Sequence, residues 1–170
     1  MTLKIIGAIF IITGCGGYSI LLVIKYRKEE QYLQELFEVL QYMISELQYK
    51  LTPLPDLCRQ CAGESSGALR DVFRNLSREL DWQMMPDAKS CMVEALKNSR
   101  DLPKGLRRLL SQLGHSLGRF DLPGQICGLE GVKTNCAEMI KRYGNDRNTR
   151  LRNCQTLGIC AGAALVILLV

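Results

Sequence analysis

Two apolar runs, one near each end of the chain, constrain the fold more than any other feature of the sequence. Residues 3–24 contain a single charge, on Lys4, and residues 157–170 contain none. As a helix the first run is about 33 Å long, enough to cross a bilayer core of about 30 Å. The second run is only about 21 Å long, so it either starts near Cys154 and spans the bilayer or inserts part-way.

Basic residues indicate that the polar middle of the chain is cytoplasmic. They follow the first run and precede the second: Lys25, Arg27 and Lys28, then Lys141, Arg142, Arg147, Arg150 and Arg152. Because cytoplasmic loops of membrane proteins carry an excess of lysine and arginine, both termini are expected to point across the membrane. The predicted segments are an N-terminal transmembrane helix over 1–26, a helical cytoplasmic domain over 27–153, and a C-terminal transmembrane or membrane-inserted helix over 154–170.

An alternative interpretation of the first run reverses this topology. Ile12-Thr13-Gly14-Cys15 fits the cleavage site of a bacterial lipoprotein, in which Cys15 carries the lipid and the domain lies outside the cell. The apolar run continues past this site to Ile24, and the dense basic cluster follows the run, whereas a signal peptide has its charges first. The transmembrane interpretation is therefore preferred.

The middle of the chain has the hydrophobic periodicity of α-helices and no alternating pattern long enough to predict a strand. One stripe of apolar residues, three and four positions apart, predicts the first helix: Leu33, Leu36, Phe37, Leu40, Ile44, Leu47 and Leu51. Five similar segments follow it. The predicted fold class is all-α, a six-helix bundle-like soluble domain flanked by N- and C-terminal membrane helices.

Capping residues and breakers predict where several helices begin and end. Threonine is a good N-cap and proline is favoured at the first helical position, so Thr52 is expected to cap a helix over 53–62. The glycines and serines of residues 63–67 are the next break. Asp121 is the expected N-cap of the last helix, over 122–143.

The cysteines offer little that predicts a metal or redox centre. Cys58 and Cys61 have C-x-x-C spacing, but no second pair exists, His115 is the single histidine, and a zinc site needs about four ligands. A thioredoxin-like motif also needs a βαβ context, which this region lacks. These cysteines are therefore expected to be small apolar residues on helix faces, with no metal and no cofactor bound.

Signatures of catalysis and of nucleic-acid binding are absent from the sequence. A lone histidine cannot supply acid–base chemistry by itself, and no H-E-x-x-H or G-x-x-x-x-G-K motif is present. The net charge of +5 is largely accounted for by the membrane topology. The basic cluster at 100–119 is expected to face solvent or lipid headgroups. We therefore expect that the protein is not an enzyme and that it binds no nucleic acid and no small-molecule substrate.

Two short motifs carry a resemblance to a known family. Residues 46–55, ELQYKLTPLP, fit the pattern E-x-x-Y-x-x-T-P-L, and residues 113–125, LGHSLGRFDLPGQ, fit LG-x-x-LG-x-x-D-x-x-x-Q. Together with the two apolar runs, they make the chain similar to the stage III sporulation protein AB family of endospore-forming bacteria. The motif positions are Glu46, Tyr49, Thr52, Pro53 and Leu54, then Leu113, Gly114, Leu117, Gly118, Asp121 and Gln125.

The resemblance implies a non-enzymatic scaffold or platform subunit of the secretion-like channel complex between mother cell and forespore, which sporulation requires. It implies a location in the mother-cell membrane around the forespore. The implied partners are membrane lipid and the other subunits of the complex, with the cytoplasmic ATPase as a candidate. The family is similar to the helical domain of the platform protein, component F, of type II secretion and type IV pilus machines. That platform protein has two such domains, whereas this chain has one. Homo-oligomerisation is therefore an option, because a dimer would supply the second domain.

The resemblance also implies structural roles for the motifs. The first motif would fix a helix corner, and Gly114 and Gly118 would allow a close turn before Asp121. The main alternative function is a generic membrane-tethered helical adaptor that binds another cytoplasmic partner. A redox or metal protein built on Cys58 and Cys61 is the second alternative.

Overall fold

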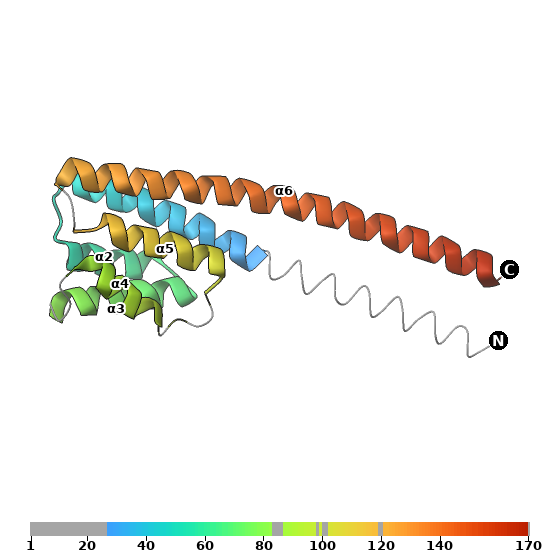
Figure 1. The fold of residues 1–170 in the computed structure, drawn as a ribbon, viewed down its shortest axis with the longest axis horizontal. Coiled ribbons are helices and arrows are strands. Elements are labelled where there is room, and N and C mark those ends of the chain that lie inside the picture. Colours follow the sequence, from blue (N-terminus) through green and yellow to red (C-terminus); the bar gives the residue numbers. More distant parts are fainter. Residues whose placement is uncertain (1–26, 83–86, 98, 100–101, 119–120, 170) are drawn as a thin grey trace. The chain divides into compact units, whose positions relative to one another are not determined.

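A computed structural model describes residues 27–82, 87–97, 99, 102–118 and 121–169, and side chains as far as Asn145. All the regular secondary structure in these residues is helical (Figure 1). The helices lie over 27–49 and at α2 Leu54–Glu64, α3 Gly67–Trp82, α4 Ala88–Lys97, α5 Lys104–Ser116 and α6 Leu122–Leu169. Over the described residues, the prediction of an all-α chain with six helices is confirmed.

The chain divides into two compact units. Residues 31–140 form one unit, and residues 1–30 with 141–170 form the other. In the first unit α2 packs on α3, α3 on α4 and α4 on α5. Of the second unit the structure describes helical backbone at 27–30 and at 141–169.

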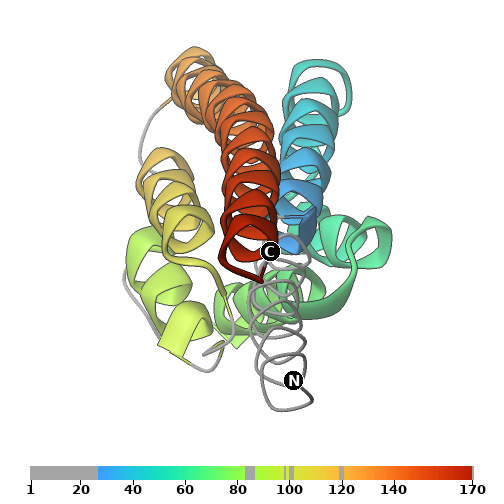
Figure 2. The same cartoon turned by 90° about the vertical axis from the view of Figure 1, so that its right-hand side faces the viewer.

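Within the unit 31–140, the first part of α6 packs against both the helix over 27–49 and α5 (Figure 2). The thiol of Cys136 donates a hydrogen bond to the backbone oxygen of Leu33 at 3.2 Å. On the preceding residue, the side-chain amide of Asn135 donates to Gln112 Oε1 at 3.3 Å. Contacts between segments so far apart in sequence close the core of this unit.

The core of this unit is built from one apolar stripe of each helix. A spacing of three and four residues puts such side chains on one face, and burying that face stabilises the helix. The largest fully buried side chains include Leu36, Leu40, Met43, Leu57, Leu69, Phe73, Leu76, Met92, Leu106, Leu109 and Leu110. The stripe predicted for the first helix is buried at Leu33, Leu36, Leu40, Ile44 and Leu47, whereas Phe37 is half-buried and the last member is exposed.

Leu51 does not belong to the buried stripe, and that part of the prediction is wrong. The helix ends at residue 49, and Leu51 lies beyond it in the left-handed region, with φ of 54° and 66% of its surface exposed. The backbone amides of Lys50 and Leu51 both donate to the carbonyl oxygen of Glu46, at 2.9 and 3.1 Å. This pattern is the one in which a helix C-terminus favours glycine.

We expect Leu51→Gly to raise the free energy of unfolding by about 0.5–1 kcal/mol, because relief of the left-handed strain exceeds the entropy that glycine adds to the unfolded chain. Urea denaturation of the purified chain measures it. Leu51→Ala removes the same exposed side chain and keeps the strain, so it should leave stability nearly unchanged. A loss of stability in Leu51→Gly would show that the Leu51 side chain makes a contact worth more than the strain.

α6 is longer than predicted. The sequence indicated a helix over 122–143, whereas α6 runs from Leu122 to Leu169. No proline follows Pro123, and a glycine such as Gly144 costs a helix only about 1 kcal/mol, too little to end it. α2 likewise runs past Gly63 to Glu64, so the break before α3 is confined to two serines.

Both predicted membrane segments fall largely outside the described residues. Residues 1–26 are outside them altogether, and for 154–169 the structure describes the helical backbone without side chains. None of the helices, taken over its described residues, combines the length and hydropathy that crossing a bilayer requires. The two anchors therefore stay predictions.

Candidate functional site

The first motif forms a corner between the helix over 27–49 and α2, and Glu46 is its centre. The Glu46 side chain is buried, with 5% of the residue exposed. Its Oε1 accepts a hydrogen bond from Lys50 Nζ at 2.7 Å, and its Oε2 accepts one from the hydroxyl of Thr52 at 2.9 Å. A buried carboxylate needs such partners, so this contact holds the chain in its turn after the helix.

The same contacts set the protonation of the corner. Hydrogen bonds from Lys50 and then from Thr52 hold the pKa of Glu46 below its usual value. The carboxylate raises the pKa of Lys50 in return. Burial, followed by the nearby charge of Glu46, raises the pKa of Tyr42, whose hydroxyl donates to Gln60 Oε1 at 2.8 Å. Tyr42 thereby links the first helix to α2 beside the corner.

Thr52 does not cap α2, and the prediction that it would is wrong. α2 begins at Leu54, and its N-cap position is Pro53, which makes no side-chain capping bond. The hydroxyl of Thr52 is donated to Glu46 instead. A buried carboxylate is a stronger acceptor than a backbone group, so it takes the donor that sequence spacing assigned to the helix end.

The other residues of the first motif divide between surface and core. Tyr49 is 83% exposed and Pro53 is also exposed, so neither fixes the corner by packing. Leu54 is half-buried, and a Cβ built on Gly118 would lie 3.9 Å from its Cδ2. The fold therefore brings Leu54 of the first motif next to Gly118 of the second.

The second motif ends α5 and starts α6. Gly118 has φ of 70°, which glycine adopts without strain. Asp121 Oδ1 accepts a hydrogen bond from the backbone amide of Gly124 at 3.3 Å, so the predicted N-cap is confirmed. Leu113 and Leu117 are buried. Gln125 is half-buried, and its backbone N–H donates to the carbonyl oxygen of Asp121 at 2.9 Å.

Gly114 lies inside α5 and takes no part in the turn, so this half of the close-turn prediction is wrong. It is buried where α5 crosses α4, and an added Cβ would meet the Cβ and Cγ of Met92 at 2.5 and 2.8 Å. Only a residue without a side chain lets the two helices approach this closely. The glycine sets a helix–helix distance.

Cys58 and Cys61 lie fully buried on α2, in agreement with their expected place on an apolar helix face. Both are free thiols. Burial raises the pKa of Cys61 to about 12, and burial raises that of Cys58 well above its usual value. Among the residues that the structure describes, no three histidine, cysteine, aspartate or glutamate side chains could hold a metal ion. His115 is exposed in the last turn of α5.

These pKa values predict selective thiol labelling. Raising a thiol pKa from 9.0 to about 12 lowers the thiolate fraction near neutral pH about a thousandfold, and the thiolate is the form that reacts. We expect maleimide to modify the exposed Cys127 of the native chain and to reach Cys58 and Cys61 only after denaturation. Peptide mass spectrometry measures this, and prompt native labelling of Cys61 would revive the redox alternative.

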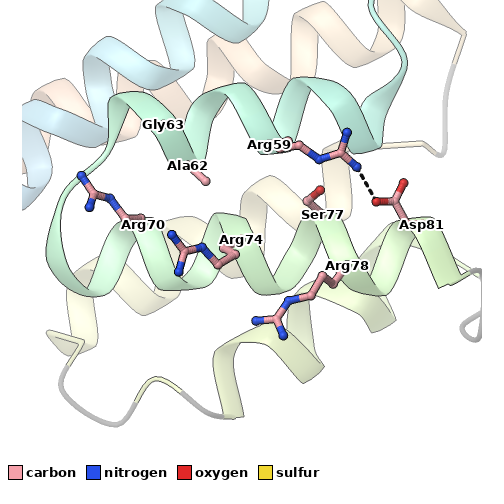
Figure 3. Close-up of a pocket in the computed structure, with 8 residues that line it drawn as sticks. All are labelled: Arg59, Ala62, Gly63, Arg70, Arg74, Ser77, Arg78 and Asp81. Carbon is pink, nitrogen blue, oxygen red and sulfur yellow. Dashed lines mark hydrogen bonds and ion pairs between the residues drawn. The ribbon is translucent and has the colours of Figure 1, made fainter.

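A pocket of about 600 Å³ lies between α2 and α3 and is rich in arginine. Figure 3 shows the two helices side by side, with Arg70, Arg74 and Arg78 following one another along α3. Arg59 enters from α2, whose Ala62 and Gly63 also line the pocket. The remaining lining residues are Ser77 and Asp81.

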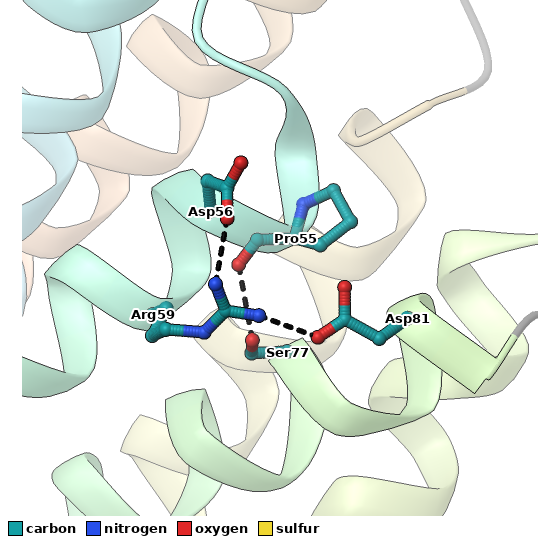
Figure 4. A network of polar contacts seen from close by, with 5 residues as sticks. All are labelled: Pro55, Asp56, Arg59, Ser77 and Asp81. Carbon is teal, nitrogen blue, oxygen red and sulfur yellow. Dashed lines mark hydrogen bonds and ion pairs between the residues drawn. The ribbon is translucent and has the colours of Figure 1, made fainter.

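A polar network closes one end of this pocket (Figure 4). The guanidinium of Arg59 donates to Asp56 at 2.7 Å and to Asp81 at 2.6 Å. Beside it, the buried Ser77 donates its hydroxyl to the carbonyl oxygen of Pro55 at 3.0 Å. The ion pairs are more than a third exposed, so each contributes less than about 1 kcal/mol to stability. Their main effect is to fix the position of Arg59.

This pocket was not predicted from the sequence. The spacing of Arg70, Arg74 and Arg78, four residues apart on one helix face, was the sequence signal for it. The sequence did not show that α2 lies opposite that face.

Arg107, in the basic cluster at 100–119, has a structural role. Its guanidinium donates to the carbonyl oxygens of Leu96, in the last turn of α4, and of Ser99, just beyond that helix, at 3.0 and 2.6 Å.

The fold and the motifs define a class of all-helical domain. In this class a buried carboxylate, Glu46, holds the turn after the first helix, and a glycine, Gly114, lets α5 pack closely on α4. The family described as Stage III sporulation protein AB (spore_III_AB) matches residues 4–170, and the chain belongs to that family. A solved structure of "Stage III sporulation protein AB (SpoIIIAB)" has the same fold, with a TM-score of 0.64 and 22% identity, over 72% of this chain and 98% of that one. No curated protein matches the chain.

Proposed function

We propose that this chain is a non-enzymatic membrane scaffold of the channel complex between mother cell and forespore. Its two apolar runs anchor it in the mother-cell membrane, and its helical domain binds other subunits from the cytoplasm, with the cytoplasmic ATPase as a candidate. The family match over residues 4–170, which takes in both apolar runs, is the observation that carries this proposal.

The geometry of the first motif supports a binding role for the corner. Glu46 and Thr52 hold the chain in a fixed turn, while Tyr49 and Leu51 are 83% and 66% exposed. Large apolar side chains held outward on a fixed turn provide contact area at little cost in conformational entropy. Another subunit can reach both side chains at the corner.

The test of function is sporulation by a strain that lacks the chain. We expect heat-resistant spores to be lost and to return when the wild-type chain is supplied. A photo-crosslinking residue at position 49 should then capture a channel subunit, whereas the same residue at the exposed Glu38 should not. Normal spores in the absence of the chain would contradict the channel role, and capture of unrelated cytoplasmic proteins would favour the adaptor alternative.

Topology has its own test, which uses the exposed Cys127. A membrane-impermeant maleimide should leave Cys127 unmodified in intact cells and label it once the membrane is permeabilised. The Cys127→Ser variant shows how much signal comes from the other cysteines. Ready labelling of intact cells would place the domain outside and favour the lipoprotein interpretation of Cys15.

A further inference from the structure

We propose that the pocket between α2 and α3 binds an acidic helical segment of a partner protein. The pocket has room for side chains of a partner, about 600 Å³. Its α2 wall is small, since Ala62 and Gly63 line it and a Cβ on Gly63 would meet nothing within 4 Å. Its charge comes from Arg59 and from the three arginines of α3. This proposal goes beyond the scaffold function and does not depend on it.

Within the part of the chain that the structure describes, the arginines of α3 lack carboxylate partners. None of the ion pairs among the described residues involves Arg70, Arg74 or Arg78. Arg70 donates to the carbonyl oxygen of Ser65 and Arg78 to Asn75, both neutral acceptors, and Arg74 makes no polar contact with any residue that the structure describes. Like charges four residues apart destabilise a helix slightly, so α3 carries an unfavourable arrangement that an anionic ligand would relieve.

The extent of the stripe determines the kind of ligand. From Arg70 to Arg78 it covers about 12 Å of helix, more than one phosphate or carboxylate can contact. Carboxylates spaced four residues apart on a second helix repeat every turn, at the same interval as these arginines. Each guanidinium can bind a carboxylate through two parallel hydrogen bonds. An acidic helix therefore fits the spacing of the site.

The ends and shape of the pocket limit how that segment binds. Asp81 is already paired with Arg59 and repels an anion there, so the acidic groups contact the arginines of α3 and not Arg59. The site is also concave, whereas a bilayer surface is flat over this distance. A recessed site between two helices favours a protein segment over lipid headgroups.

The test measures binding of a fluorescent helical peptide, with glutamate at every fourth position, to the full chain in nanodiscs of uncharged lipid. The variant is Arg74→Ala with Arg78→Ala, since both side chains are exposed and neither holds another helix. The matched control is Lys104→Ala with Arg108→Ala on α5, which removes the same charge from two exposed positions. We expect at least about tenfold weaker binding in the variant and less than about twofold in the control.

A charge exchange makes the test sharper. Arg74→Glu with Arg78→Glu should lose the glutamate peptide and gain the same peptide with lysine in place of glutamate. Equal weakening in the variant and its α5 control would overturn the proposal, as would absence of saturable binding to the wild type. Inorganic phosphate or anionic vesicles that bind through Arg74 and Arg78 while the peptide does not would also overturn it, in favour of a phosphate ligand. None of these outcomes depends on sporulation.

Discussion

Gly114→Ala is expected to lower the free energy of unfolding by about 2 kcal/mol, although alanine is the better helix former. The added methyl would lie 2.5 Å from the Cβ of Met92, which cannot swing away because it is attached to the backbone of α4. Forcing an extra methyl into a packed core costs about 3 kcal/mol, and the gain in helix propensity returns only about 1 kcal/mol. Chemical denaturation of the purified chain measures the difference.

Gly131→Ala is the matched control for this prediction. Gly131 lies in α6, is exposed, and has open space around the position of a Cβ. The substitution should therefore stabilise the chain by about 0.5–1 kcal/mol through helix propensity alone. If Gly114→Ala behaved in the same way as Gly131→Ala, the crossing of α4 and α5 would have to be looser than the structure shows.

Glu46→Ala should lower the Tm of the chain by roughly 4–8 °C, because Lys50 and the Thr52 hydroxyl lose their acceptor at the corner. Glu38→Ala, on the exposed face of the same helix, is the control and should change the Tm little. Thermal unfolding followed by circular dichroism compares the two. A Tm for Glu46→Ala that matches the control would mean that the corner is held by packing alone.

The lowered pKa of Glu46 predicts how this effect changes with pH. Because the folded state holds the pKa below the ordinary value of 4.5, the carboxylate stabilises the fold above that pH and loses this effect as the pH falls through the folded pKa. The Tm difference between the wild type and Glu46→Gln should therefore be constant from pH 6 upward and shrink below about pH 4.5. A difference that persists into acid would indicate a steric role for Glu46.

The helices could be predicted from the sequence because each buries one regular stripe of apolar side chains. Their limits could not, since they depend on competition between contacts. α6 continues beyond residue 143 because nothing after Pro123 stops it. Thr52 has the right residue type and place for an N-cap, yet a buried carboxylate from the preceding helix takes its hydroxyl.

Of the candidate site, the contacts between residues close in sequence could be predicted, and those between different helices could not. Asp121 caps α6 as expected, because that bond lies within four residues of sequence. The place of Gly114 against Met92 and the pairing of Arg59 with Asp81 both depend on which helices become neighbours. A single sequence contains the residues of such contacts without showing which of them meet.

The distribution of thiols has a consequence for work on oligomeric state. Of the five cysteines that the structure describes, Cys127 alone is exposed, and it lies in the second turn of α6. Two chains that meet at this face in air can form a disulfide between their Cys127 residues. Such a covalent dimer would survive dilution and resemble a stable native assembly. Masses measured with reductant, or with Cys127→Ser, therefore separate true self-association from oxidation.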